Sequence, residues 1–349
     1  MEHLYAVVMA GGRGERFWPL SEGERSKPFV PLLGRSTLIQ ETVERLDPLV
    51  PPERILVAIA PQHLEIARAQ LPHLPDTNYI VEPVGRDTSA CLGYAALHLD
   101  VRDPEAAMAA VPSDHFVDDA AAYRATLQRG LAALETATAV VFGVRPTRPE
   151  TGYGYIQAQP PGTADEAWPV VRFVEKPDAA TAARFVASGD YFWNSGIFLW
   201  RNRRLLELFR TYMPATFDRL GELRPLLGRD DAAAERLRIF STLERISIDF
   251  GILEKAAGLR LIPIEFGWDD IGNWAALERA LARDRDGNVM RGPAVTVEAR
   301  DCVLYSDTGM IAAFGVADLV IVQANGKVLV CPKGRAADLK RLVASLDRT

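Results

Sequence analysis

Short, wholly apolar runs alternate with amphipathic segments through the first 144 residues of the chain. Apolar runs that end at glycine, proline or polar residues are typical of buried strands, and we expect such strands at 4–10, 54–60, 78–83, 106–112 and 139–144. Helical spacing of apolar residues between them predicts helices at 36–46, 63–71, 88–99 and 123–136. This alternation predicts an α/β fold with a Rossmann-like, mostly parallel sheet and helices on both faces.

The rest of the chain departs from this alternation. Between residues 152 and 200, short β-prone runs separated by turn residues predict an antiparallel insertion or extension that lies over the sheet. Near the C-terminus, short apolar runs and tight turns, with a hairpin signal in ANGK (324–327), precede a closing helix. We therefore expect a large domain at 1–285 and a small β-rich domain with a terminal helix at 286–349.

Composition narrows the class of protein. The chain has 349 residues, 48% of them hydrophobic, and a formal net charge of −6 that is not gathered into blocks, so we expect neither a nucleic-acid nor a membrane partner. No apolar run approaches the roughly 18 residues of a membrane span, and the N-terminus lacks the pattern of a secretory signal. Cys91, Cys302 and Cys331 form no CxxC pair, which disfavours a disulfide framework or a zinc site and favours a cytoplasmic protein.

The strand expected at 4–10 ends in a glycine-rich turn, in the stretch VVMAGGRGERFWPLSEGERSKP (7–28). Glycines let backbone N–H groups approach an anion closely, so this turn suits a phosphate group. It is not a dinucleotide-binding GxGxxG, since Phe17 stands in place of the third glycine, and no GK[ST] marks a P-loop. Only six of the 40 basic residues are lysine, and Lys27 and Lys176 alone lie within the first 250 positions, which makes both candidates for a task that arginine cannot perform.

This stretch resembles the signature of the sugar-1-phosphate nucleotidyltransferases, a Gly-Gly-x-Gly-x-Arg-x-x-Pro-Leu run with a lysine downstream. The residues that match it are Gly11, Gly12, Gly14, Arg16, Pro19, Leu20 and Lys27. Further stretches resemble the mannose-1-phosphate guanylyltransferase branch, in the family's order: EPVGRDTSA (82–90), VPSDH (111–115), PTRPETGYGYI (146–156), FVEKP (173–177), FWNSGIFLW (192–200), ISIDFGILEK (246–255) and GWDDIGNW (267–274). The tail after residue 286 also resembles the short, β-helix-like C-terminal domain of that branch. Two positions depart from the family pattern, because Asp87 replaces a usual Asn and Ser26 stands where Pro is frequent.

The resemblance implies an enzyme that transfers GMP from GTP to α-D-mannose 1-phosphate and releases pyrophosphate. A phosphate monoester is mostly dianionic at neutral pH, because its second pKa is about 6, so the nucleophile needs no side-chain base. The chemical problem is to bring two polyanions together in line while cations neutralise the developing charge. By resemblance, the catalytic residues are Arg16, Lys27, Lys176, Asp114 and Asp270.

The resemblance also assigns ligand contacts. Asp114 and Asp270 are the implied ligands of Mg²⁺ or another divalent ion, although spacing alone leaves Asp269 as a competitor of Asp270. Asp114 follows the strand expected at 106–112, at the carboxyl edge where open α/β sheets bind ligands. The implied nucleotide-binding residues are Gly11, Gly12, Gly14, Arg16, Lys27, Gly85, Arg86, Asp87 and Ser113. The implied sugar-phosphate-binding residues are Gly154, Glu175, Lys176, Asn194 and Gly196.

Two alternatives stay open at this point. One is another sugar-nucleotide pyrophosphorylase with a different nucleotide or hexose 1-phosphate, because base and sugar choice depend on a few loop contacts. The other is a non-catalytic regulatory homologue, which is expected to lack a phosphate-binding lysine or a metal-binding aspartate, whereas this chain keeps both kinds of residue. Exposed edges of short strands readily pair with another chain, so we also expect a homodimer.

Overall fold

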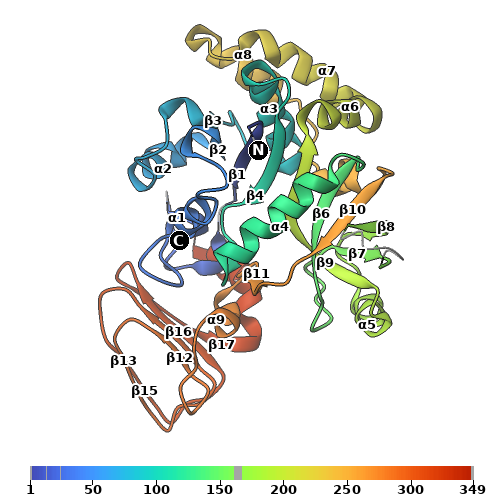
Figure 1. The fold of residues 1–349 in the computed structure, drawn as a ribbon. Coiled ribbons are helices and arrows are strands. Elements are labelled where there is room, and N and C mark those ends of the chain that lie inside the picture. Colours follow the sequence, from blue (N-terminus) through green and yellow to red (C-terminus); the bar gives the residue numbers. More distant parts are fainter. Residues whose placement is uncertain (1, 13, 24, 161–166, 347–349) are drawn as a thin grey trace.

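The computed structural model of the protein describes residues 2–12, 14–23, 25–160 and 167–346. The strands of its main sheet are β1 (Leu4–Ala10), β2 (Ile55–Ile59), β3 (Tyr79–Val81), β4 (Ala107–Pro112), β6 (Ala139–Val144), β7 (Tyr155–Ala158), β8 (Trp168–Val174), β9 (Tyr191–Arg201) and β10 (Leu259–Pro263). Within the described residues these nine strands form one mixed sheet in the order β3-β2-β1-β4-β9-β6-β10-β8-β7 (Figure 1). The predicted α/β architecture is confirmed.

The parallel pairings of this sheet lie mainly in one half, and the other half contains one, between β6 and β10. β1 pairs in parallel with β2 and with β4, and β2 pairs in parallel with β3. β9 runs antiparallel between β4 and β6, whereas β7 and β8 extend the sheet beyond β10 through antiparallel pairings. The prediction that residues 152–200 lie over the sheet is therefore wrong in its placement: they form part of it. β9 is buried along most of its length, as an internal strand must be.

Two apolar layers cover the two faces of the sheet. The helices that form them are α1 (Leu38–Glu44), α2 (Leu64–Gln70), α3 (Asp87–Arg102), α4 (Ala120–Ala133), α6 (Asn202–Tyr212), α7 (Pro214–Leu223) and α8 (Ala233–Phe240). Tyr5 and Val7 of β1 pack with residues of α3, α6, α7 and α8, whereas Ala6 and Val8 pack with residues of α1, α2 and α4. Burial on both faces explains why β1 is a continuous apolar run.

The helix-start signal predicted from the sequence at residues 37–40 is also confirmed. Helix α1 begins with the predicted capping box, formed by Thr37 and Gln40. A further helix, α5 (Ala179–Ser188), packs against the β7–β9 end of the sheet. None of the helices in the described residues has the length and apolar character that a bilayer span requires.

The C-terminal part is a small β-helix. Its strands are β12 (Val289–Arg291), β13 (Ala294–Val297), β14 (Val303–Ser306), β15 (Ile311–Phe314), β16 (Leu319–Ala324) and β17 (Lys327–Pro332). β12, β14 and β16 stack in parallel on one side, β13 and β15 stack in parallel on another, and β17 closes the stack as an antiparallel hairpin with β16. Asn325 and Gly326 in that hairpin have φ values of 52° and 71°, as a type I′ turn requires.

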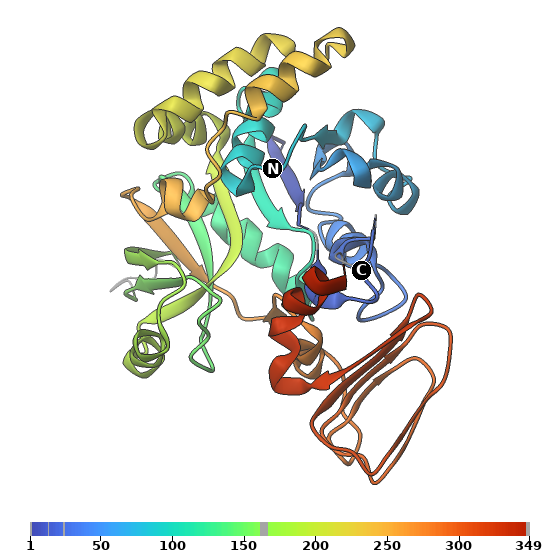
Figure 2. The ribbon, with the colours of Figure 1, turned by 180° about the vertical axis from the view of Figure 1, so that it is seen from behind.

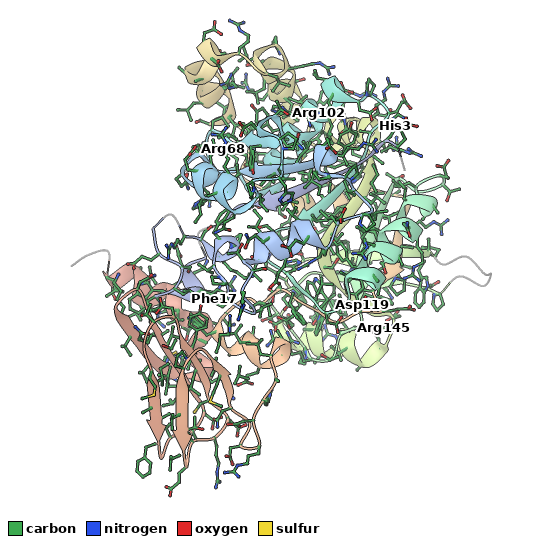
Figure 3. The ribbon with its side chains drawn as sticks, turned by 60° about the vertical axis from the view of Figure 1, so that its left-hand side comes forward. His3, Phe17, Arg68, Arg102, Asp119 and Arg145 are labelled. Carbon is green, nitrogen blue, oxygen red and sulfur yellow. The ribbon has the colours of Figure 1, made fainter. Side chains whose placement is uncertain are left out.

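A third apolar cluster joins the β-helix to the N-terminal stretch. Phe17 and Leu20 pack there with Trp274, with Tyr305 of β14 and with Leu339 of the terminal helix α10 (Leu339–Leu346). Figure 2 shows α10, in dark red, beside the blue N-terminal segment, and Figure 3 shows Phe17 at the junction of the two parts. The loop that carries the glycine-rich signature is therefore packed directly against the C-terminal part.

Candidate active site

The signature loop follows β1 and Asp114 follows β4, and the two lie close together because β1 and β4 are adjacent parallel strands. Met9 of β1 lies opposite Pro112 of β4, and the Ser113 N–H donates to the Met9 carbonyl oxygen at 3.2 Å. Both strands thus end at the same edge of the sheet, which is where open α/β folds bind ligands.

Backbone conformation explains the glycines of the loop. Gly12 and Gly14 have φ values of 97° and 64°, in the region that glycine adopts without strain. Gly14 has a second constraint, because a Cβ there would lie 2.6 Å from the Lys27 backbone nitrogen. Gly11 and Gly12 are exposed, and no atom lies within 4 Å of the place that their Cβ would take. Their backbone can therefore be approached closely by a phosphate.

Lys27 contacts both of the aspartates that were predicted to bind a metal ion, Asp114 and Asp270. Its Nζ lies 2.8 Å from Asp114 Oδ2 and donates to the Asp270 carbonyl oxygen at 2.5 Å. The Lys27 residue is only 7% exposed, and its ammonium lies 5.8 Å from the centroid of the Phe17 ring. The site thus holds a compact cation that donates in two directions, a geometry that a planar guanidinium does not reproduce. We call Lys27, Asp114 and Asp270 the Lys27 cluster.

Asp270 and Asp269, the two neighbouring candidates for the metal-binding carboxylate, have different hydrogen-bond partners. The Tyr153 hydroxyl donates to Asp270 Oδ1 at 2.6 Å, and the Asp270 carbonyl oxygen accepts from Lys27 Nζ. Asp269 is buried and faces the other way, because the Arg279 guanidinium donates to both of its oxygens and the Ile271 N–H donates to Oδ1 at 2.9 Å. The carboxylate of Asp269 is therefore occupied by local contacts, whereas that of Asp270 has the Tyr153 hydroxyl as its recorded hydrogen-bond partner among the described residues.

Arg16 reaches the same place from the signature loop. A Cβ on Gly272 would lie 3.2 Å from Asp270 Oδ2 and 3.5 Å from Arg16 Nη1, so the exposed guanidinium lies near that carboxylate. Burial acts to raise the pKa of Asp114, but the ammonium of Lys27, with smaller contributions from His115 and Arg16, outweighs it and holds that pKa below its ordinary value. Asp114 is therefore ionised at neutral pH.

His115 links this cluster to the antiparallel strands. Burial lowers the pKa of His115 to about 4, and its Nδ1 lies 3.2 Å from the Trp268 indole nitrogen, which donates to it. The ring is therefore neutral at pH 7 and already holds a donor. A Cβ on Gly196, which has a φ of 71°, would lie 3.3 Å from Pro112 Cγ and 3.7 Å from His115 Cε1, so β9 passes close to this edge.

Three of the predicted sugar-binding residues meet at one point. A Cβ on Gly154 would lie 2.3 Å from Glu175 Oε2 and 3.2 Å from Asn194 Cβ, so only glycine fits there. The Asn194 N–H donates to the Gly154 carbonyl oxygen at 2.8 Å. Glu175 Oε2 is buried and finds no hydrogen-bond partner within the described residues. This acceptor is available for a hydroxyl donor.

Lys176 lies beside this group. Its N–H donates to the Tyr153 carbonyl oxygen at 3.2 Å, and its Nζ donates to Glu175 Oε1 at 2.5 Å. The side chain is 59% exposed and the backbone φ is 46°. In the part of the chain that the structure describes, the recorded hydrogen-bond partners of Lys176 are Glu175 and Tyr153, and neither belongs to the Lys27 cluster.

The predicted nucleotide-binding residues 85–87 lie in a loop that packs against the segment 241–248. Arg86 donates to the Ser241 carbonyl oxygen, and the Thr88 hydroxyl accepts from the Ile248 N–H at 2.9 Å. Asp87 has a φ of 68°, in the left-handed region where Asn and Asp are favoured. The exchange of Asn for Asp at this position therefore preserves the backbone. Gly85 is exposed, whereas the buried hydroxyl of Ser113 has no hydrogen-bond partner among the described residues.

Two acidic residues that were not predicted from the sequence, Asp249 and Glu254, hydrogen-bond to predicted sugar-binding residues. Asp249 Oδ1 accepts a hydrogen bond from Asn194 Nδ2 at 2.8 Å, and Glu254 Oε1 accepts from the Glu175 N–H at 3.0 Å. Burial, helped by the negative charge of Glu175, raises the pKa of Asp249 to about 6. Both acids belong to the stretch ISIDFGILEK (246–255), which carried the resemblance but received no role.

Asp114 and Asp270 of the Lys27 cluster are the predicted ligands of a divalent cation. Within the described residues there is no group of three or more His, Cys, Asp or Glu side chains that could hold a metal ion. A small hard cation such as Mg²⁺ is commonly held by only one or two protein carboxylates, with substrate phosphates and water completing the set. Lys27 Nζ joins the two residues, through the carboxylate of Asp114 and the backbone carbonyl oxygen of Asp270.

Comparisons with protein families cover nearly the whole chain. The model of the nucleotidyl transferase family matches residues 5–287. The model of a MannoseP isomerase/GMP-like beta-helix domain matches residues 292–346.

Similar individual proteins and a similar solved structure indicate the same family. The chain is 36% identical over 350 residues to the xanthan biosynthesis protein XanB of Xanthomonas campestris pv. campestris, covering 99% of this chain and 74% of that protein. It is 35% identical over 354 residues to a mannose-1-phosphate guanylyltransferase of Escherichia coli K12, covering 98% and 73%. A crystal structure from Thermus thermophilus, described as a mannose-1-phosphate geranyltransferase, superposes with a TM-score of 0.91 at 39% identity over 99% of both chains. The chain therefore belongs to the nucleotidyl transferase family, as a member of its mannose-1-phosphate guanylyltransferase branch.

Proposed function

We propose that the protein transfers GMP from GTP to α-D-mannose 1-phosphate, giving GDP-mannose and pyrophosphate. One observation carries this proposal: the Lys27 cluster lies at the carboxyl edge of β1 and β4, next to a glycine loop with open backbone. Membership of the guanylyltransferase branch supports the choice of substrates.

The chemistry requires no general base. The sugar phosphate is already dianionic at neutral pH, and His115, the histidine beside the cluster, has a pKa of about 4 and accepts a hydrogen bond from Trp268. Rate enhancement would come from positioning and from charge neutralisation at the α-phosphorus. A phosphate oxygen of the sugar phosphate forms the new P–O bond, and the bond to pyrophosphate breaks on the opposite side.

We assign the two substrates to two different groups of residues in the site. We assign the triphosphate to Lys27, Arg16 and the open backbone of Gly11 and Gly12, and the sugar phosphate to Lys176. Glu175 and Asn194 would hold hydroxyl groups of the sugar, supported by the unpartnered Glu175 Oε2.

We assign Asp114 and Asp270 as the residues that hold Mg²⁺. When bound, the ion would screen the charge that develops on the phosphates.

A substrate matrix with the purified chain tests the function. GTP, ATP, dTTP and UTP are each paired with mannose, glucose and galactose 1-phosphates, and pyrophosphate release is measured together with the sugar nucleotide formed. We expect GTP with mannose 1-phosphate to exceed every other pair by at least about ten-fold, a difference that a few polar contacts can provide. EDTA should abolish turnover, and added Mg²⁺ should restore it. A different best pair would favour another pyrophosphorylase, and no turnover with any pair would favour a non-catalytic homologue.

We also propose that the enzyme is a cytoplasmic homodimer. Three free cysteines support a reducing compartment. The outer face of β13 and β15 supports the dimer, because Val295, Val297 and Phe314 are each more than half exposed there and Val297 pairs in register with Phe314. Sedimentation equilibrium should give twice the mass of the chain, and Phe314→Ser should give a folded monomer. A monomeric wild-type protein would contradict the dimer.

A further inference from the structure

The last hairpin of the β-helix holds the outer side of the signature loop. Asn325 Nδ2 donates to the carbonyl oxygens of Pro19 at 2.8 Å and of Leu20 at 3.3 Å. Nearby, Lys327 Nζ lies 2.5 Å from both carboxylate oxygens of Glu22. A turn that is more than 300 positions away along the chain therefore holds residues 19–22, which lie between the glycines and Lys27.

Contacts inside the loop carry this restraint to the cluster. The Ser21 N–H donates to the Phe17 carbonyl oxygen at 3.0 Å, and the Ser21 hydroxyl donates to the Gly14 carbonyl oxygen at 2.5 Å. Gly14 in turn packs so tightly on the Lys27 backbone that no side chain fits between them. An unbroken series of contacts thus joins Asn325 to the ammonium that sits between the two aspartates.

The hairpin is built to present this amide in a fixed place. Asn325 occupies a two-residue turn, since Ala324 and Lys327 are directly paired. Ala324 and Leu329 of the hairpin belong to the same apolar cluster as Phe17 of the loop. Turn geometry alone explains an Asn at this position, but Asp or Gly would serve the turn equally well. The two bonds from Nδ2 are what Asn adds.

We propose that Asn325 is a positioning residue for the nucleotide side of the reaction, through which the β-helix holds the signature loop in the conformation that places Gly14 and Lys27 against the triphosphate. This inference rests on the proposed function and adds a positioning role for the C-terminal part. The sugar side is built on β7, β8 and β9 and receives nothing from Asn325, so the effect should be confined to the nucleotide.

Two substitutions test the proposal. Asn325→Gly and Asn325→Asp both tolerate a positive φ and keep the hairpin, but neither has a side-chain N–H. With two hydrogen bonds lost, we expect kcat/KM for GTP to fall by about ten-fold. KM for mannose 1-phosphate should stay within error of wild type, and the thermal midpoint should fall by only a few degrees. The amide protons of Leu20 and Ser21 should exchange about ten-fold faster, because the loop opens more often.

Glu298→Gly is the matched control. Glu298 is an exposed residue with a φ of 53° in another turn of the β-helix, so this variant changes a left-handed position without touching the signature loop. It should match wild type in GTP kinetics and in loop exchange. The proposal is wrong if Asn325→Gly and Asn325→Asp also match wild type, or if they raise KM for both substrates and lower the thermal midpoint together. If the wild-type chain makes no GDP-mannose, the proposed function fails, and loop exchange with GTP affinity decides this inference alone.

Discussion

Replacing Lys27 with methionine should lower kcat/KM by roughly 100- to 1,000-fold, the loss typical of one preorganised charge contact at a reacting group. The side chain is almost fully buried, and its ammonium is held by Asp114 and by the Asp270 carbonyl oxygen. Methionine keeps the length of the side chain but offers no charge to the triphosphate. Lys27→Arg should recover little activity, because a planar guanidinium cannot satisfy both acceptors where Gly14 presses on the backbone. Steady-state kinetics of both variants measure this.

Lys333→Met is the control for lost stability. Lys333 Nζ lies 2.5 Å from Glu278 Oε1 and donates to the Asp301 carbonyl oxygen at 2.8 Å, so it copies the carboxylate and carbonyl partners of Lys27 away from the Lys27 cluster. We expect Lys333→Met to lower the urea midpoint while kcat stays within about two-fold, since neither Glu278 nor Asp301 belongs to the signature loop or to the Lys27 cluster. Full activity of a folded Lys27→Met variant would show that the triphosphate is neutralised elsewhere.

The sequence was sufficient for elements whose signals are local. β1 is an apolar run because both its faces are covered, and the capping box at Thr37 and Gln40 is complete within four residues. The antiparallel direction of β9 was predicted, but its place between β4 and β6 was not accessible in this way. Antiparallel insertion between β4 and β6 depends on packing between segments about 90 positions apart, as Ala107 and Arg201 are, and a short apolar run carries no record of its neighbour.

In the candidate site, too, some residues could be located from the sequence and others depended on contacts between distant segments. Residues that follow predicted strands, such as Asp114, are located by topology, because parallel strands end together. Asp249 had no such signal: it acts by holding the amide of Asn194 from a segment 55 positions away. The choice between Asp269 and Asp270 likewise depended on where Arg279 points, which adjacent positions in a sequence cannot reveal.

Asp270→Asn should reduce kcat by at least about 100-fold while leaving the protein folded, since oriented metal and charge contacts at a phosphoryl group contribute several kcal/mol to the barrier. Asparagine keeps an oxygen that can accept from the Tyr153 hydroxyl, so the geometry at 2.6 Å is preserved and only the charge is lost. The Mg²⁺ concentration for half-maximal rate should rise, and the urea midpoint should stay close to that of wild type. A metal titration and an unfolding curve measure the two quantities on the same sample.

Asp269→Asn should show the opposite pattern. Its carboxylate is buried, accepts two hydrogen bonds from Arg279 and one from the Ile271 N–H, and leaves a half-buried guanidinium poorly paired when its charge is removed. We expect a loss of about 2–4 kcal/mol in unfolding free energy, with kcat of the folded fraction within a few-fold of wild type. If Asp269→Asn instead loses turnover at full stability and Asp270→Asn keeps it, the metal-binding role belongs to Asp269. The pair of variants therefore settles which neighbouring carboxylate serves the phosphates and which one holds Arg279 in place.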